Sequence, residues 1–221
     1  MSGPLALVGG GEWRAGCDFD RDLLAASGAS EVAVLPAAAA YEHPERTVEA
    51  ATEWFASLGA TVRPVMALDR AGSHDHDNVT AVQSARFLYI ADGSPMHLRS
   101  VLMQSPLWNA VVEAWQGGAV VAGSAAGAMV LCDPMVDPRG GAFTLGLGLV
   151  SQLGFVPRAD TWSEDKLHRT LQLAPPDLPV AGVDERTALL RDPDGTWHAA
   201  GAGNVRVWVN GKAAELTALP G

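Results

Sequence analysis

The chain has 221 residues, of which 48% are hydrophobic and 18% charged, and its formal net charge is −10. This length is enough for a sizeable core and is most simply one domain covering residues 1–221. The acidic balance argues against nucleic-acid binding, and no apolar run approaches the roughly 20 residues of a membrane helix.

The start of the chain and its cysteines bear on the compartment. Residues 1–4 lack a basic region, so we expect no signal peptide. Cys17 and Cys132 have no framework spacing and are expected to be free thiols in a reducing compartment. We therefore expect a cytoplasmic protein with no nucleic-acid or membrane partner and no cofactor.

The first half of the chain alternates apolar runs with helical patterns. Strands are expected at residues 5–8, 31–35, 61–66 and 86–91. Helices are expected at 19–27 and about 44–58, followed by a helix bearing Leu98 and Val101 and by a helical stripe from Trp108 to Trp115. Residues 73–78, which include His74-Asp75-His76-Asp77, are expected to be a solvated loop rather than a metal site.

Residues 118–131 are the part of the sequence around which the prediction is built. Residues 119–122 predict a buried central strand, and helix-forming residues follow the small-residue turn 123–127. A strand that enters a helix through such a turn is the frame of a nucleophile elbow, whose middle residue is strained and points outward. That middle residue is Ala125, which carries no nucleophile.

The second half of the chain is richer in strands. Residues 132–143 are expected to be a loop, and a helix capped at Ser163 is expected within 158–173. Short strands are expected at 180–183, 188–191, 198–200 and 205–209, with a hairpin at Asn210-Gly211. The sequence thus predicts an α/β fold, with a mainly parallel central sheet, helices on both faces and a strand-rich C-terminal part.

The elbow resembles that of the dipeptidase E/cyanophycinase family of serine peptidases, which typically reads Gly-(Thr/Ser)-Ser-Ala-Gly-Ala. Residues 123–128 match this pattern except at the serine, and further matches lie at 8–10, 35–38, 92–94 and 136–138. The resemblance implies a class I glutamine amidotransferase-like, flavodoxin-like fold. It also implies cleavage of aspartyl peptides and a cleft for a small acidic or peptide-like molecule.

Serine hydrolysis also needs a histidine base. The family's Pro-His-(aromatic/Ala)-Asp stretch corresponds here to residues 157–160, which places Arg158 at the histidine position. Arginine stays protonated and cannot act as a base near neutral pH. His168, ten residues later in a predicted helix, is the remaining candidate, with an ordinary surface histidine as the alternative.

The family pattern also implies an orienting acid and oxyanion donors. Asp133 is the better candidate for the acid, although turn-forming aspartates at 133 and 137 remain an alternative. The backbone N–H groups of Gly93 and Ala126 are the implied donors. The preceding residue is Asp92, and a carboxylate beside an oxyanion hole opposes the developing negative charge.

We expect Asp92 and Arg158 to face each other as an ion pair across the site. Gly10, Ser94 and Ser124 complete the predicted binding set, with Ser124 pointing away from the apex of the elbow. Arg158 is also a candidate to bind a ligand carboxylate bidentately.

The sequence is compatible with three functions. The chain is a peptidase homologue with lost or repurposed activity, or an active Asp-specific serine peptidase carrying an engineered Ser-to-Ala change with His168 as base. Alternatively it is an acid–base enzyme, such as a cyclase or isomerase, using Asp92 as proton carrier. A structural role with Trp13 or Trp162 as exposed contacts, and a homodimer, are also open.

Overall fold

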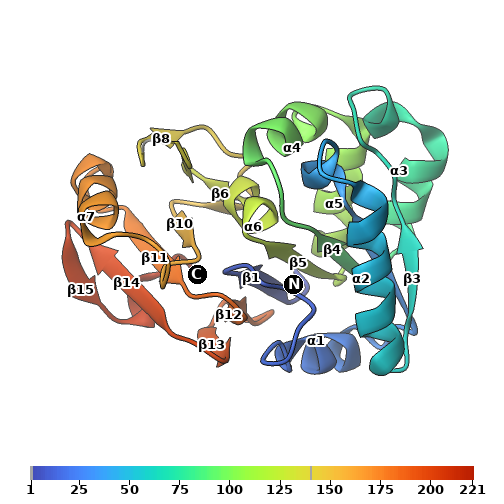
Figure 1. Cartoon of the computed structure of the whole chain (residues 1–221), viewed down its shortest axis with the longest axis horizontal. Helices are drawn as coiled ribbons and strands as arrows, with labels where there is room; N and C mark the ends of the chain where they lie inside the picture. Colours follow the sequence, from blue (N-terminus) through green and yellow to red (C-terminus); the bar gives the residue numbers. More distant parts are fainter. Residues whose placement is uncertain (1, 140) are drawn as a thin grey trace.

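The computed structural model describes residues 2–139 and 141–221, and its main element is a seven-stranded sheet of order β13-β12-β1-β5-β4-β2-β3 (Figure 1). Five neighbouring strands run parallel: β1 (Leu5–Val8), β5 (Val120–Ser124), β4 (Phe87–Ile90), β2 (Glu31–Leu35) and β3 (Thr61–Pro64). Two antiparallel strands, β12 (Thr187–Arg191) and β13 (Trp197–Gly201), extend the sheet beyond β1. The carboxyl ends of the five parallel strands therefore lie along one edge.

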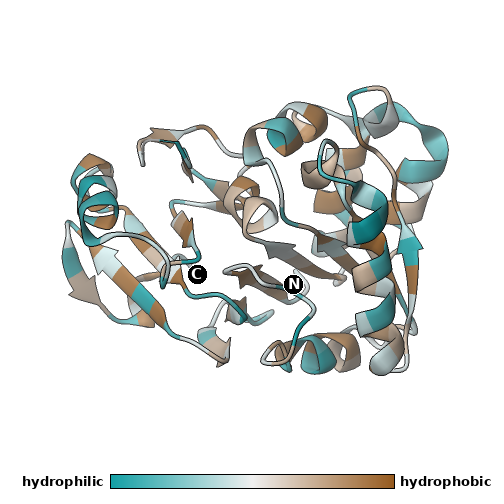
Figure 2. Cartoon of the chain, in the orientation of Figure 1, coloured by the Kyte–Doolittle hydropathy of each residue, from teal (hydrophilic) through white to brown (hydrophobic). Residues whose placement is uncertain are grey.

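Helices cover both faces of this sheet, as the sequence predicts. One face packs against α1 (Phe19–Ser27) and α2 (Pro44–Ser57). The other packs against α3 (His76–Gln83), α4 (Pro95–Leu102), α5 (Pro106–Gln116) and α6 (Ala126–Leu131). Because successive side chains of a strand point to opposite faces, each buried strand supplies both cores, and much of the central strands is brown in Figure 2.

A second sheet occupies the C-terminal part, with the order β10-β11-β14-β15. Its strands are β10 (Gly154–Pro157), β11 (Pro179–Val183), β14 (Val205–Val209) and β15 (Lys212–Ala214), and α7 (Glu164–Leu173) lies beside it in Figure 1. The hairpin predicted at Asn210-Gly211 joins β14 to β15. Ser163 caps α7, as predicted, by accepting the N–H of Lys166 at 3.3 Å.

Two segments predicted as loops are structured. Residues 73–78 fall in a short η2 turn (Gly72–His74) and the start of α3, because the Asp75 carboxylate accepts the N–H groups of Asp77 and Asn78, both at 3.0 Å. Within 132–143 lie β6 (Cys132–Asp133), β7 (Met135–Val136) and the start of β8 (Phe143–Thr144). β6 pairs with β9 (Val150–Ser151), and β7 pairs with β8. The remaining 3-10 turns are η1 (Ala37–Ala39) and η3 (Leu216–Ala218).

The two tryptophans proposed as exposed contacts are not free surface groups. Trp13 is buried, with its ring centroid 5.2 Å from that of Tyr89. Trp162 is partly buried, and the Lys166 ammonium lies 3.7 Å from its ring centroid. Trp13 as an exposed contact is therefore wrong. Among the helices that the structure describes, none is long and apolar enough to cross a membrane.

Candidate active-site cleft

The elbow predicted at residues 123–127 is present at the carboxyl end of β5. Ala125 joins β5 to α6 with φ 39° and ψ −96°, and its N–H donates to Val8 O at 2.9 Å. A Cβ on Gly127 would lie 2.4 Å from Ile90 O, so strand and helix approach too closely there for a larger residue. The backbone that aims a nucleophile is formed, and an alanine occupies its apex.

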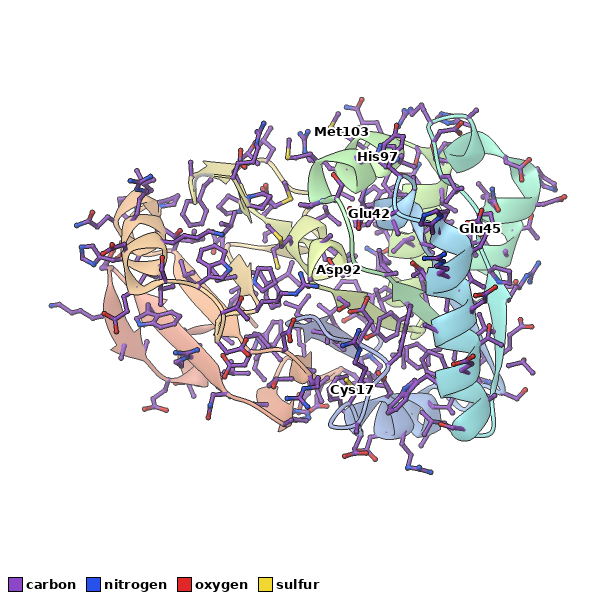
Figure 3. All side chains as sticks on the ribbon, in the orientation of Figure 1. Cys17, Glu42, Glu45, Asp92, His97 and Met103 are labelled. Atoms are coloured by element: carbon purple, nitrogen blue, oxygen red, sulfur yellow. The ribbon has the colours of Figure 1, made fainter. Side chains whose placement is uncertain are left out.

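The two predicted oxyanion donors both point at a carboxylate of this chain. The N–H groups of Gly93 and Ala126 donate to the same oxygen, Asp92 Oδ1, at 2.7 and 3.1 Å. Gly93 has φ +143°, and a Cβ there would lie 2.3 Å from Ala38 O, so the turn requires glycine. Figure 3 marks Asp92, which follows β4 and lies beside the N-terminus of α6. An acidic side chain thus engages both of the N–H groups that the sequence predicts as oxyanion donors.

Arg158 bonds to the other Asp92 oxygen, as the sequence predicts. Its Nη2 pairs with Asp92 Oδ2, and its Nε donates to Glu185 Oε1 at 2.9 Å. Partial burial lowers the pKa of Arg158, but Asp92 and then Glu185 outweigh this effect, and the pKa is raised overall. Arg158 therefore stays charged and cannot accept a proton.

Backbone contacts fix Arg158 over the glycine turn that follows β1. Its own φ is 48°, and its N–H donates to Gly9 O at 2.7 Å. A Cβ on Gly10 would lie 3.1 Å from Arg158 Cγ, so the missing side chain leaves room for the arginine. Gly10 thus belongs to the site as a packing position.

A cleft of about 370 Å³ opens beside this ion pair. It is lined by residues 11–14 after β1, by Arg46, Thr47 and Ala50 of α2, and by Asp92, Arg158 and Glu185. Ala125 is only 1% exposed. The apex of the elbow is therefore covered, although the cleft beside it is open.

A family comparison agrees with this geometry. The model of Peptidase family S51 matches residues 5–196. The chain belongs to Peptidase family S51.

Two curated cyanophycinases are among the relatives, from Synechococcus elongatus and Thermosynechococcus vestitus. Each is 26% identical over 151 residues, which cover 63% of this chain and 46% of the relative. The chain thus matches less than half the length of these relatives.

Solved structures of peptidases share the fold. A peptidase from an acI-B1 Actinobacterium has a TM-score of 0.85 and 26% identity, with 97% of each chain covered. A putative peptidase E protein from Listeria monocytogenes EGD-e has a TM-score of 0.67 and 16% identity, covering 95% of this chain and 99% of that one. The second likeness concerns the fold alone.

Glu12 belongs to the site of this S51 member and was missed from the sequence. Its Oε1 accepts the N–H of Asp92 at 3.2 Å, and its Oε2 accepts the Ser124 hydroxyl at 2.7 Å. Burial and then the charge of Asp92 raise the pKa of Glu12. Its position just after β1 could have indicated this role, because the carboxyl ends of adjacent parallel strands meet at one edge of a sheet.

Glu185 was also missed, and it is the second carboxylate, besides Asp92, that contacts Arg158. It comes two residues after β11 and contacts Arg158. Asp133, the predicted acid, lies elsewhere: its Oδ1 accepts the N–H of Gly146 at 2.8 Å, and it lines a different cavity beside Pro134 and Gln152. The structure therefore does not bring Asp133 to Arg158.

The other predicted residues have local roles. His168 is exposed on α7 and lines a separate cavity with Leu171 and Asn210, so it does not reach the elbow. Ser94 caps α4 by accepting the N–H of His97 at 3.3 Å. Ser124 is fully buried and turned toward Glu12, away from the apex of the elbow.

Proposed function

We propose that this S51 member binds a small acidic or peptide-like molecule in its cleft without serine-peptidase chemistry. The observation that carries the proposal is the position of Asp92, whose Oδ1 accepts both N–H groups that would stabilise an oxyanion. A tetrahedral intermediate would have to displace a carboxylate that Arg158 also holds. Ala125 supplies no hydroxyl and Arg158 no base.

Stepwise restoration tests this proposal. We expect the wild-type protein and Ala125→Ser to leave Asp-X dipeptides uncleaved, because a serine alone restores neither base nor oxyanion hole. The triple variant Ala125→Ser/Arg158→His/Asp92→Gly should release amino acids, with Glu185 placed to orient the new histidine. The same triple variant with Glu185→Gln is the matched control and should lose most of that gain.

Turnover by wild type or by Ala125→Ser alone would overturn the proposal in favour of an active peptidase. The active reading with His168 as base gains no support from the fold, because His168 lies on α7 and lines a different cavity. Liquid chromatography of the dipeptide mixtures separates these outcomes directly.

Acid–base catalysis is a second candidate, and Glu12 favours it. Asp92 is engaged by two N–H groups and an arginine, whereas Glu12 lines the cleft and has a raised pKa. A carboxyl group with a raised pKa in a cleft is suited to proton transfer. The test is exchange of carbon-bound protons of small acidic probes in D2O, followed by NMR: acid–base function requires exchange that Glu12→Gln abolishes.

A further inference from the structure

The charged groups that line the cleft fall into two classes. Its carboxylates are all engaged: Asp92 and Glu185 with Arg158, and Glu12 with the Ser124 hydroxyl. Arg14 and Arg46 line the same cleft, and within the described chain neither takes part in an ion pair. The positive charge left without a partner therefore lies on these two side chains.

The two arginines reach the cleft from different elements. Arg14 comes from the loop after β1, and Arg46 from the first turn of α2. Both are exposed, and their sequence neighbours Thr47 and Trp13 also line the cleft. Guanidinium groups match the geometry of carboxylate and phosphate, and two of them from separate elements can hold one anion from two sides.

Arg158 is a poor anchor for a ligand anion in comparison. Its Nε and Nη2 already donate to carboxylates of the chain, so a ligand would have to compete with Asp92 and Glu185. Binding an anion at Arg14 and Arg46 breaks no internal pair. The predicted bidentate contact from Arg158 to a ligand is therefore less favourable than contacts from these two residues.

We propose that Arg14 and Arg46 form an anion-binding subsite of the cleft, which takes the carboxylate or phosphate group of a small organic anion. This inference rests on the proposed function, since it identifies the part of the cleft that recognises the acidic group. The volume of about 370 Å³ suits a molecule of amino-acid to dipeptide size.

The test is an NMR titration of the 15N-labelled full chain that follows the arginine Nε–H signals. The probes are succinate, its neutral isostere succinamide, and inorganic phosphate, which separates carboxylate from phosphate recognition. We expect saturable shifts at Arg14 and Arg46 with succinate or phosphate but not with succinamide. Arg14→Gln/Arg46→Gln should weaken anion binding by about tenfold or more, because each lost contact is a charge-assisted hydrogen bond.

Arg21→Gln, on the exposed surface of α1, is the matched control and should bind the anions as wild type does. Added KCl should weaken binding to the wild type by screening. Unchanged anion affinity in the double variant, equal binding of succinamide, or no saturable binding to wild type would each overturn the subsite. Cleavage of Asp-X dipeptides by wild type would instead overturn the proposed function and leave the subsite standing.

Discussion

Arg158 holds two carboxylates through separate nitrogens, and each of those carboxylates depends on it for charge balance. Asp92 has only 18% of its side-chain surface exposed, so it keeps little hydration if the arginine is removed. An ion pair broken on one side leaves an uncompensated charge, which is more damaging than losing both charges together. The chain should therefore be sensitive to which partner is changed.

Arg158→Ala should lower the free energy of unfolding by about 1–2 kcal/mol, a value reduced for solvent screening because the arginine is 41% exposed. Asp92→Asn/Arg158→Ala should recover part of that loss, since no unpaired carboxylate then remains at 92. Arg139→Ala, which breaks the exposed pair with Asp137, is the control and should change little. Urea denaturation measures all three, and equal stability of Arg158→Ala and wild type would contradict the prediction.

Asp20 is a second residue whose charge is governed by its surroundings. It is fully buried at the start of α1, and Trp54 Nε1 donates to its Oδ2 at 2.9 Å. Burial raises the pKa of Asp20 from 3.8 to about 8. Between these values the folded protein holds a proton that the unfolded chain has lost, so the free energy of unfolding falls as pH rises.

Asp20→Asn should flatten the decline in stability between about pH 4 and pH 8, because asparagine accepts from Trp54 without a charge to bury. Glu12 contributes in the same direction, so some slope should remain. Urea melts at several pH values give the slope, and Asp22→Asn, exposed on the same helix, is the control. A slope as steep as that of wild type would show that Asp20 is ionised in the folded protein.

At the scale of elements, the elbow depends on glycine for steric reasons that the sequence already indicated. Gly127 lies inside α6, where alanine would ordinarily favour the helix. The close approach of Ile90 O reverses that preference. The close contact between β4 and α6 keeps Ala126 N–H near Asp92.

Gly127→Ala should therefore destabilise the protein by roughly 2 kcal/mol, within the range for overpacked cores. Gly117→Ala, at the end of α5, meets its nearest neighbours at 3.2 and 3.3 Å and should have a much smaller effect. Thermal denaturation of the two variants measures this difference. Similar melting temperatures for both would mean that the elbow can relax to accommodate the added methyl group.

The elements most open to sequence-based prediction were those with a local physical cause. Apolar runs and the cap at Ser163 gave correct strands and a correct helix start. Helix α3 was missed altogether, because its cap, Asp75, lies within a polar run typical of loops. The two-residue strands β6 and β7 depend on partners many residues away, and such pairing leaves little periodicity.

In the candidate site, too, some residues could be located from the sequence and others could not. Asp92 and Arg158 could be paired because the elbow pattern and its family resemblance located both. Glu12 could have been suspected from its place after β1, but its contacts with Asp92 and Ser124 depend on the folded sheet. Glu185 follows a strand of the second sheet, and only the folded chain brings it to Arg158. Asp133 was favoured by its closeness in sequence to the elbow, which here leads to a separate cavity.

At the scale of the whole molecule, the two cysteines report on the packing of both cores. Cys17 lies in the core that includes α1 and Cys132 in the core that includes α6, and both are fully buried. Burial raises the pKa of Cys17 to about 11 and raises that of Cys132 further. Neither thiol is therefore a ready nucleophile in the native state.

Native protein should react slowly with a thiol-reactive dye, and both thiols should become reactive together as urea rises. Coincident exposure is expected if residues 1–221 unfold as one cooperative unit, which is the domain organisation predicted from the sequence. Mass spectrometry of pulse-labelled protein, with Cys17→Ala and Cys132→Ala variants to separate the signals, measures each thiol. If one thiol became reactive at a much lower urea concentration than the other, the chain would contain parts that unfold separately.

The glycine turn after β1 is bonded to segments on the far side of the site. Gly9 O accepts the N–H of Arg158, and Gly10 O accepts the N–H of Arg186, both at 2.7 Å. Arg158 in turn reaches back to Asp92, in the loop that follows β4 of the first sheet. The Asp92–Arg158 pair thus links the loop after β4 of the first sheet to the segment after β10 of the second, so separating the two sheets would break an ion pair as well as these backbone hydrogen bonds.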